Sequence, residues 1–234
     1  PPLISIIIPC YNSTTTLPRT LSSIAMQSIK DKCKVYLCDD CGKDDYDNII
    51  STFSNLLDIT YFRLLENRGA GQARQFGIDL STEPYITFID SDDTFANSFS
   101  IEQLYNKMLE NTETDLVVGN FEEQVENKAD TILHDLNATW LHGKLFKRSF
   151  LDENNIRFNK TRLNEDVYFL NLIWATTEKI VHLDKVVYHW LTNENSLTRN
   201  INDDLARVKT HIGFIDNQIK LYQEKKRRSI EKTN

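Results

Sequence analysis

The chain has 234 residues, of which 40% are hydrophobic and 26% charged, with a formal net charge of −7 at pH 7. This length suits one α/β domain with an appendage, and the acidic balance excludes a general electrostatic attraction to nucleic acid or anionic lipid. Nothing resembles a signal peptide, and no apolar run approaches the ~20 residues of a membrane span, so we expect a cytoplasmic protein.

The first half of the chain alternates β-rich runs with helical patterns. Residues 4–8 are almost all β-branched, which predicts a strand buried on both faces. Further strands are predicted at 35–38, 59–65, 85–89 and 115–118, with helices between them. This order predicts a mostly parallel sheet with helices on both faces.

Beyond residue 120 the pattern is less regular. A polar stretch at 122–135 precedes a helix predicted over about 164–175, and two short strands are predicted at 179–183 and 186–191. No internal repeat or low-complexity linker interrupts the chain, so we expect one domain with a distinct C-terminal part.

Polar groups follow the first four predicted strands at the points where these strands end. They are Asn12-Ser13, Asp39-Asp40, Asn67-Arg68-Gly69 and the acidic group at 90–93. Because the carboxyl ends of parallel strands meet at one edge of a sheet, we expect these groups to form a ligand site.

The acidic group carries three carboxylates, on Asp90, Asp92 and Asp93. Carboxylates held this close repel one another unless a cation neutralises them. Oxygen ligands suit Mg²⁺ or Mn²⁺, which bridge substrate phosphates. The alternative is a helix start, since Asp and Thr are favoured as N-caps.

Two nucleotide-binding classes are disfavoured, because no Gly-rich turn follows the first strand and no Walker A sequence is present. A phosphatase stays open as an alternative. The segment 90–94 fits the DxDxT motif of haloacid-dehalogenase-like phosphatases, in which the first Asp is a nucleophile and the second a general acid. That family usually carries the motif on its first strand, whereas here it follows the fourth.

The ordered motifs resemble those of the GT-A fold glycosyltransferases of family 2. In the first half, 5–12 resembles SIIIPxYN, 37–45 resembles VDDGSxD with departures at Cys41 and Lys43, 67–75 is similar to NxGxxxARN, and 88–93 is similar to the DxD segment. In the second half, 140–151 resembles W-x-K-L-[FY]-x-R-x-x-L, and 164–169 resembles the family's ED motif. Residues 188–190 together with 196–199 resemble the closing segment of the family.

The resemblance implies a GT-A fold: a Rossmann-like α/β domain with a mostly parallel sheet, helices on both faces and a C-terminal helical segment. The catalytic domain would span 1–200, with a nucleotide-sugar-binding part at 1–119 and an acceptor part at 120–200. Residues 201–234 would form the C-terminal helix.

The resemblance also implies roles for single residues in an inverting, one-step transfer from a UDP-sugar. Asp166 would be the general base. Asp92 and His189 would bind Mn²⁺ or Mg²⁺, although a packed strand histidine is the alternative for His189. The nucleotide would contact Pro9, Tyr11, Asp40, Asn67, Arg74, Asp90, Ser91, Ser196 and Arg199.

The acceptor implied by the family is a hydroxyl of a cell-surface glycan or a teichoic-acid-type polymer. A modified nucleic-acid base is an alternative acceptor, against which the net charge of −7 weighs. A nucleotide-sugar-binding subunit without turnover is a further alternative, against which the intact carboxylates weigh.

The last segment has a heptad pattern, with apolar residues spaced by 3, 4, 3, 4 and 3. They are Leu205, Val208, Ile212, Ile215, Ile219 and Tyr222. Such a seam predicts either a helix packed on its own domain or a helix that pairs with a second copy, which would make a homo-oligomer.

Overall fold

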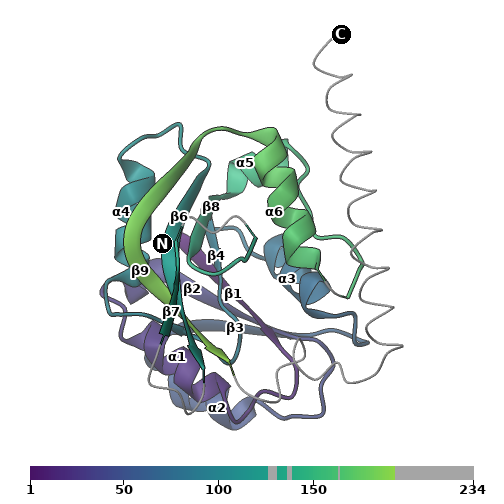
Figure 1. Cartoon of the computed structure of the whole chain (residues 1–234). Coiled ribbons are helices and arrows are strands. Elements are labelled where there is room, and N and C mark those ends of the chain that lie inside the picture. The colour runs from purple at the N-terminus through teal and green to yellow at the C-terminus, as the bar shows by residue number, and fades with distance from the viewer. Residues whose placement is uncertain (126–130, 136–138, 163, 193–234) are drawn as a thin grey trace.

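The computed structural model describes residues 1–125, 131–135, 139–162 and 164–192 (Figure 1). The predicted helix at 201–234, its heptad seam, Ser196 and Arg199 lie outside these residues. In the described part of the chain, no helix combines the length and apolar character needed to cross a bilayer.

The first half forms the predicted parallel sheet. Its strands are β1 (Ile4–Cys10), β2 (Cys33–Asp39), β3 (Asp58–Arg63) and β4 (Tyr85–Phe88), in the spatial order β3-β2-β1-β4. Every residue of β1 is buried, as its β-branched composition predicts. Because β1 lies between β2 and β4, the loops after these strands meet at one edge of the sheet.

Helices cover both faces of the sheet. One core cluster joins Ile6 and Ile8 of β1 to α1 (Leu17–Ala25), α2 (Asp47–Phe53) and α4 (Ser100–Leu109). The other joins Ile7 to α3 (Ala70–Leu80), α5 (Arg148–Glu153) and α6 (Glu165–Thr176). Figure 1 shows α3, α5 and α6 together on one side of the sheet. The alternation of side chains along β1 therefore supplies both cores.

The second half adds strands to the same sheet. They are β5 (Thr94–Phe95), β6 (Leu116–Val125), β7 (Thr131–His134), β8 (Lys144–Lys147) and β9 (Ile180–Thr192). The main path continues β4-β8-β6-β9-β5, and β7 pairs with β6. Strand β8 is antiparallel to both β4 and β6, while β6 and β9 are parallel. A short 3₁₀ turn, η1 (Lys30–Lys32), precedes β2.

One expectation for the second half was wrong. The two short strands predicted at 179–183 and 186–191 are one strand, β9, because register shifts on either side of Asn120 in β6 accommodate its extra residues. Within the polar stretch, residues 122–124 at the end of β6 pair antiparallel with β7.

Candidate active site

The loops at the carboxyl edge of the sheet are tied to one another through Asn12 and Asp40. The Asn12 side chain accepts a hydrogen bond from the backbone N–H of Lys43 at 2.6 Å. The two carboxylate oxygens of Asp40 accept the N–H groups of Arg68 and Gly69, each at 2.7 Å. The predicted convergence of the polar loops is therefore confirmed for the ends of β1, β2 and β3.

The residues predicted to hold a nucleotide base differ in how accessible they are. Tyr11 is 51% exposed at the end of β1, which leaves its ring free to stack on a base. Pro9 is buried within β1 and Asp40 is 4% exposed. Each Asp40 oxygen already accepts a backbone N–H, but a carboxylate oxygen has a second lone pair that a ligand donor can use.

Asn67 and Ser91 border the same edge of the sheet. The backbone carbonyl of Asn67 accepts a hydrogen bond from Arg162 at 2.8 Å, which connects the loop after β3 to the segment before α6. Ser91 is half-buried, between Asp90 and Asp92. Their predicted contacts with a nucleotide stay predictions.

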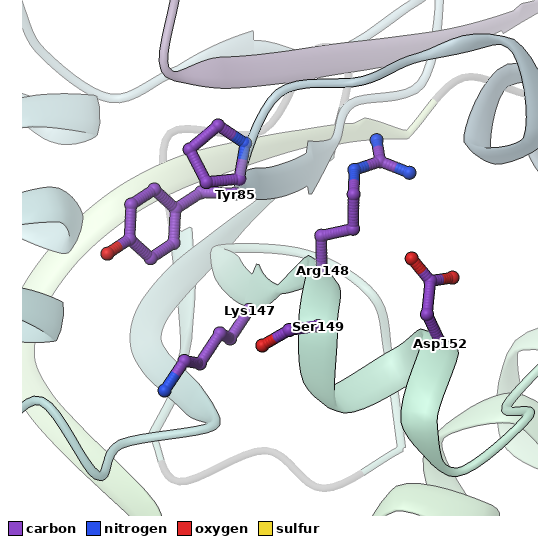
Figure 2. A pocket seen from close by; sticks show the side chains of 6 residues that line it. Tyr85, Lys147, Arg148, Ser149 and Asp152 are labelled. Carbon is purple, nitrogen blue, oxygen red and sulfur yellow. The ribbon is translucent and has the colours of Figure 1, made fainter.

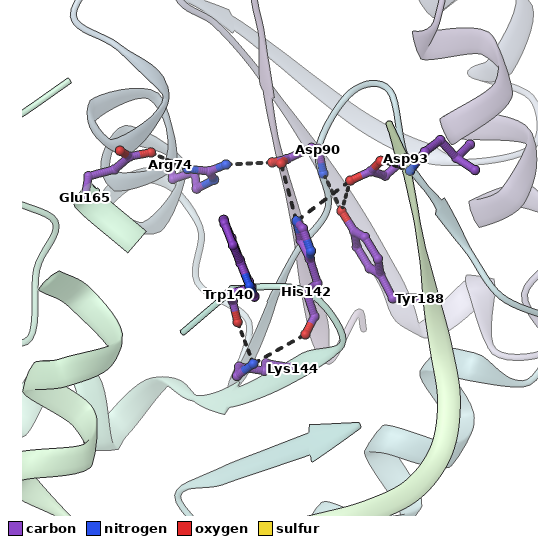
Figure 3. A network of polar contacts seen from close by, with 9 residues as sticks. Arg74, Asp90, Asp93, Trp140, His142, Lys144, Glu165 and Tyr188 are labelled. Carbon is purple, nitrogen blue, oxygen red and sulfur yellow. Dashed lines mark hydrogen bonds and ion pairs between the residues drawn. The ribbon is translucent and has the colours of Figure 1, made fainter. Parts of the chain in front are cut away.

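Arg74 joins the two halves of the site. It is 6% exposed, and its guanidinium donates to Asp90 at 2.6 Å and to Glu165, at the start of α6, at 3.0 Å (Figure 3). A Cβ built on Gly71, one turn before Arg74 in α3, would overlap the Glu165 side chain. The absence of a side chain at position 71 therefore lets Glu165 reach Arg74.

The three aspartates of the acidic group have unlike surroundings. Burial acts to raise the pKa of Asp90, but the charge of Arg74 and the neighbouring His142 hold that pKa well below its usual range. Burial and the charge of Asp90 raise the pKa of Asp92 to about 6. Burial and the charges of Asp90 and Asp92 raise the pKa of Asp93. Without a cation, the group does not favour three simultaneous charges.

Asp93 also fixes the position of the acidic group. It is 1% exposed, and its carboxylate accepts hydrogen bonds from the Tyr188 hydroxyl at 2.6 Å and the Leu191 N–H at 2.8 Å. The Tyr188 oxygen in turn accepts the N–H of Asp90 at 3.2 Å. Strand β9 therefore holds the loop after β4 in place (Figure 3).

His142 points its ring at the acidic group. Its Nε2 lies 3.7 Å from an Asp90 oxygen and 3.9 Å from an Asp93 oxygen. The ring lies between Trp140 and Tyr188, at 11° to each ring plane and with centroid distances of 6.1 and 4.6 Å. Its Nδ1 has no hydrogen-bond partner among the described residues. Burial lowers the pKa of His142, which favours the neutral ring that can coordinate a metal.

Asp90, Asp93 and His142 offer ligand atoms that all lie within 4.8 Å of one another. Two carboxylate oxygens and a neutral imidazole nitrogen form a donor set that suits a divalent cation. The raised pKa values of Asp92 and Asp93 indicate that the protein alone does not balance the negative charge of the acidic group. These residues therefore fit a divalent metal.

The two residues predicted from the resemblance as metal ligands lie outside this triad. Asp92 is half-buried and close enough to Asp90 for their charges to interact. His189 lies on β9 opposite Thr94, with its Nε2 3.6 Å from Glu122 and its side chain 24% exposed. That contact agrees with the alternative of a packed strand histidine. Both ligand roles stay predictions.

Asp166 lies in the first turn of α6, after Asn164, which has a left-handed backbone conformation. One carboxylate oxygen accepts the N–H of Val167 at 2.8 Å. Burial raises the pKa of Asp166, and the charge of Arg74 opposes this rise. A carboxylate with a raised pKa is a better proton acceptor near neutral pH than an ordinary one, as the predicted base requires.

Residues 5–163 match the family described as Glycosyl transferase family 2. The chain belongs to this family. The match covers the acidic group and the His142 segment, and it sets aside the phosphatase alternative, which shared only the spacing of DxDxT.

Two similar proteins of known name are both glycosyltransferases. The chain is 26% identical over 223 residues to glycosyltransferase GlyA of Streptococcus pneumoniae, covering 84% of this chain and 31% of GlyA. It is 30% identical over 185 residues to the poly(ribitol-phosphate) β-N-acetylglucosaminyltransferase TarP of Staphylococcus aureus, covering 71% of this chain and 55% of TarP. The chain thus spans about a third and about half of these two relatives.

Solved structures confirm the GT-A fold. The crystal structure of residues 1–349 of S. aureus TarS in complex with UDP-GlcNAc matches with a TM-score of 0.73 and 21% identity, covering 86% of this chain and 62% of that one. A TarS structure in complex with UDP matches with a TM-score of 0.69 over 82% of this chain.

Sequence reasoning did not assign several residues that the structure of this family member places at the site. They are His142, Glu165 and Tyr188. All three fall within the motif segments, so a signal was present in the sequence. Their partners are distant along the chain, however, and residue spacing alone could not reveal them.

A shallow pocket lies at the opposite end of β4 from Asp90. It is lined by Pro84, Tyr85, Lys147, Arg148, Ser149 and Asp152 (Figure 2). The Arg148 guanidinium donates to the carbonyls of Glu83 and Ile78 and to the hydroxyls of Ser5 and Ser81, so its donors already stabilise the fold. We therefore expect the site for the sugar donor at the carboxyl edge of the sheet, beside Asp90.

Proposed function

We propose that this chain is the catalytic domain of an inverting, metal-dependent glycosyltransferase that transfers a sugar from a UDP-sugar to an acceptor hydroxyl. The observation that carries the proposal is the cluster of Arg74, Asp90, Asp93 and His142 at the carboxyl edge of the parallel sheet, in a chain of family 2. The TarS complex with UDP-GlcNAc supports a UDP-sugar donor. The name of TarP supports a teichoic-acid-type polymer or another cell-surface glycan as the acceptor.

The metal, Mn²⁺ or Mg²⁺, would be held by Asp90, Asp93 and His142, together with Asp92, the ligand that the family resemblance predicts. When bound, it would supply positive charge that stabilises the diphosphate leaving group. Tyr11 and Asp40 would hold the base, and Arg74 would orient Asp90 toward the nucleotide.

On the acceptor side, Asp166 would accept the proton of the attacking hydroxyl. Its place at the start of α6 separates it along the chain from the loops that hold the donor. Attack from the face opposite the leaving group inverts the anomeric configuration, so a base on the acceptor side suits a one-step transfer.

The test is a screen of sugar nucleotides by thermal denaturation, with and without Mn²⁺. UDP or a UDP-sugar should raise the Tm only when the cation is present, because ligand binding to the folded state stabilises it. Asp92→Asn should abolish transfer and leave the Tm of the free protein close to that of the wild type. Asp31→Asn, at an exposed position in η1, is the control. Full transfer activity in EDTA would contradict metal dependence.

A further inference from the structure

Lys144 is a buried lysine for which the proposed chemistry has no use. Its side chain is 0% exposed at the start of β8. No described carboxylate lies within ion-pair distance of it, and Nζ donates instead to the main-chain carbonyls of Trp140 at 2.5 Å and His142 at 3.5 Å (Figure 3). Burial lowers the pKa of Lys144 to about 7, because an ammonium group without a carboxylate partner is unfavourable in the interior. A lysine at this position therefore calls for a role.

The two carbonyls belong to the residues whose rings form the site. The His142 ring faces Asp90 and Asp93, and the Trp140 ring stacks on the His142 ring. The Lys144 side chain therefore contacts the backbone of the two residues that carry these rings. In this arrangement Lys144 Nζ donates to the backbone of the segment and makes no contact with the acidic group.

Hydrogen bonds to two other strands hold residues 143 and 144 of the same segment. Gly143 has a φ of +66°, which glycine adopts without strain, and its carbonyl accepts the N–H of Gly119 at 2.8 Å. The carbonyl of Lys144 accepts the Thr87 hydroxyl at 2.8 Å, which attaches the segment to β4. The carbonyls of Trp140 and His142 accept hydrogen bonds from Lys144 Nζ. The lysine side chain therefore holds the part of the turn that these other bonds do not reach.

We propose that Lys144 is a positioning residue, whose buried Nζ holds the 140–142 backbone so that the His142 ring faces Asp90 and Asp93. This inference rests on the proposed function. It goes beyond it by assigning the geometry of the His142 nitrogen to a lysine whose Nζ donates to backbone carbonyls. Residues that orient a metal ligand typically change metal affinity by about 10- to 100-fold when they are replaced.

The test compares Lys144→Met, which keeps much of the apolar stem and removes the donors, with the wild type. Lys147→Met is the matched control, because Lys147 lies on the same strand and donates to the Thr112 carbonyl at 2.8 Å, but does so at the surface. Mn²⁺ affinity in the presence of UDP is measured by electron paramagnetic resonance. Near-UV circular dichroism reports on the packing of the tryptophans, of which Trp140 and Trp190 are 5.3 Å apart.

We expect Lys144→Met to weaken Mn²⁺ binding at least about tenfold and to alter the near-UV spectrum, with the far-UV spectrum unchanged. Lys147→Met should match the wild type in all three measurements. In a His142→Ala background, Lys144→Met should have no further effect on Mn²⁺ affinity, because the lysine acts through the histidine. An additional loss in that background would contradict the proposal.

A folded Lys144→Met protein with wild-type Mn²⁺ affinity and a wild-type near-UV spectrum would overturn the proposal. If Lys144→Met does not fold, Lys144→Gln retains a hydrogen-bond donor and takes its place, with intermediate Mn²⁺ affinity expected. Failure of both to fold would assign Lys144 to general stability and refute the positioning role. If wild-type protein binds neither Mn²⁺ nor UDP, the proposed function fails, while the near-UV comparison still tests whether Lys144 sets the ring geometry.

Discussion

The carboxylates of the site differ in the protonation state that their surroundings favour. Arg74 and His142 lower the pKa of Asp90 against the effect of burial, so Asp90 stays ionised and suits a role in holding positive charge. Burial raises the pKa of Asp166, which brings its proton affinity closer to what a general base needs at neutral pH. Unequal surroundings thus give chemically identical side chains different tasks.

Replacement of Asp166 by Asn should lower turnover by about 10²-fold or more, because the amide keeps the size and hydrogen bonding of the carboxylate but cannot accept the proton. UDP affinity should barely change. Single-turnover transfer assays and UDP titration check the two expectations. Asp152→Asn is the control, since Asp152 lies on α5, away from the acidic group. There it forms an ion pair with Arg157 at 2.9 Å. Weakened UDP binding with normal turnover would refute the role of base, as would a product that retains the donor's anomeric configuration.

At the scale of single elements, α3 lies against β1 and β2 at Gly77. A Cβ at this position would lie 2.5 Å from Ile7 Cγ2 and 2.9 Å from Cys38 Sγ, both on fully buried strand residues. The helix therefore packs close to the sheet because position 77 carries no side chain. This close approach also fixes the distance between the sheet and Arg74, which lies one turn earlier in α3.

Gly77→Ala should lower the free energy of unfolding by up to about 2 kcal/mol, because overpacking costs about 1–3 kcal/mol and the gain in helix propensity offsets about 1 kcal/mol of this cost. Urea denaturation measures the change. Asp79→Ala, at an exposed position of the same helix, separates the effect of propensity from that of packing. Equal stability of Gly77→Ala and wild type would show that α3 can move away from the sheet without loss.

The elements of the first half were predictable because each strand and helix there has a local pattern. The β-branched run of β1 and the polar groups that follow the strands correctly predicted the sheet and the edge at which the polar loops converge. The second half was predicted less well. The polar pair Asp184-Lys185 has the composition of a turn, yet β9 continues through it because β6 shifts register there. His142 was missed for a related reason: its neighbours Asp90, Phe121 and Tyr188 come from three separate segments.

At the scale of the whole molecule, a buried contact between side chains connects α3 to α6. Glu165 of α6 lies 3.0 Å from Arg74 of α3, and both are less than 10% exposed. The attraction to Arg74 would lower the pKa of Glu165, but burial outweighs it and raises this pKa to about 7. Arg74 also pairs with Asp90, so its charge is shared between two carboxylates.

Stability in EDTA should therefore fall as the pH rises from about 4 through about 7. In this range the folded protein keeps a proton on Glu165 that the unfolded chain, with an ordinary Glu pKa of about 4.3, has released. Glu165→Gln should make stability depend less on pH over the same range, because the amide does not titrate. Urea midpoints at pH 5 and pH 7.5 provide the measurement. An unchanged pH dependence in Glu165→Gln would assign the effect to other acids.

The contact between Gly71 and Glu165 limits how this protein can be recombined with its relatives. A chimaera that combines residues 1–119 from one enzyme with the part of this chain from residue 120 onward would join an α3 and an α6 with separate evolutionary histories. If the incoming helix carries any side chain at position 71, it will collide with Glu165 and displace the partner of Arg74. Acceptor specificity should therefore be exchanged with residues 71, 74 and 165 transferred as one set.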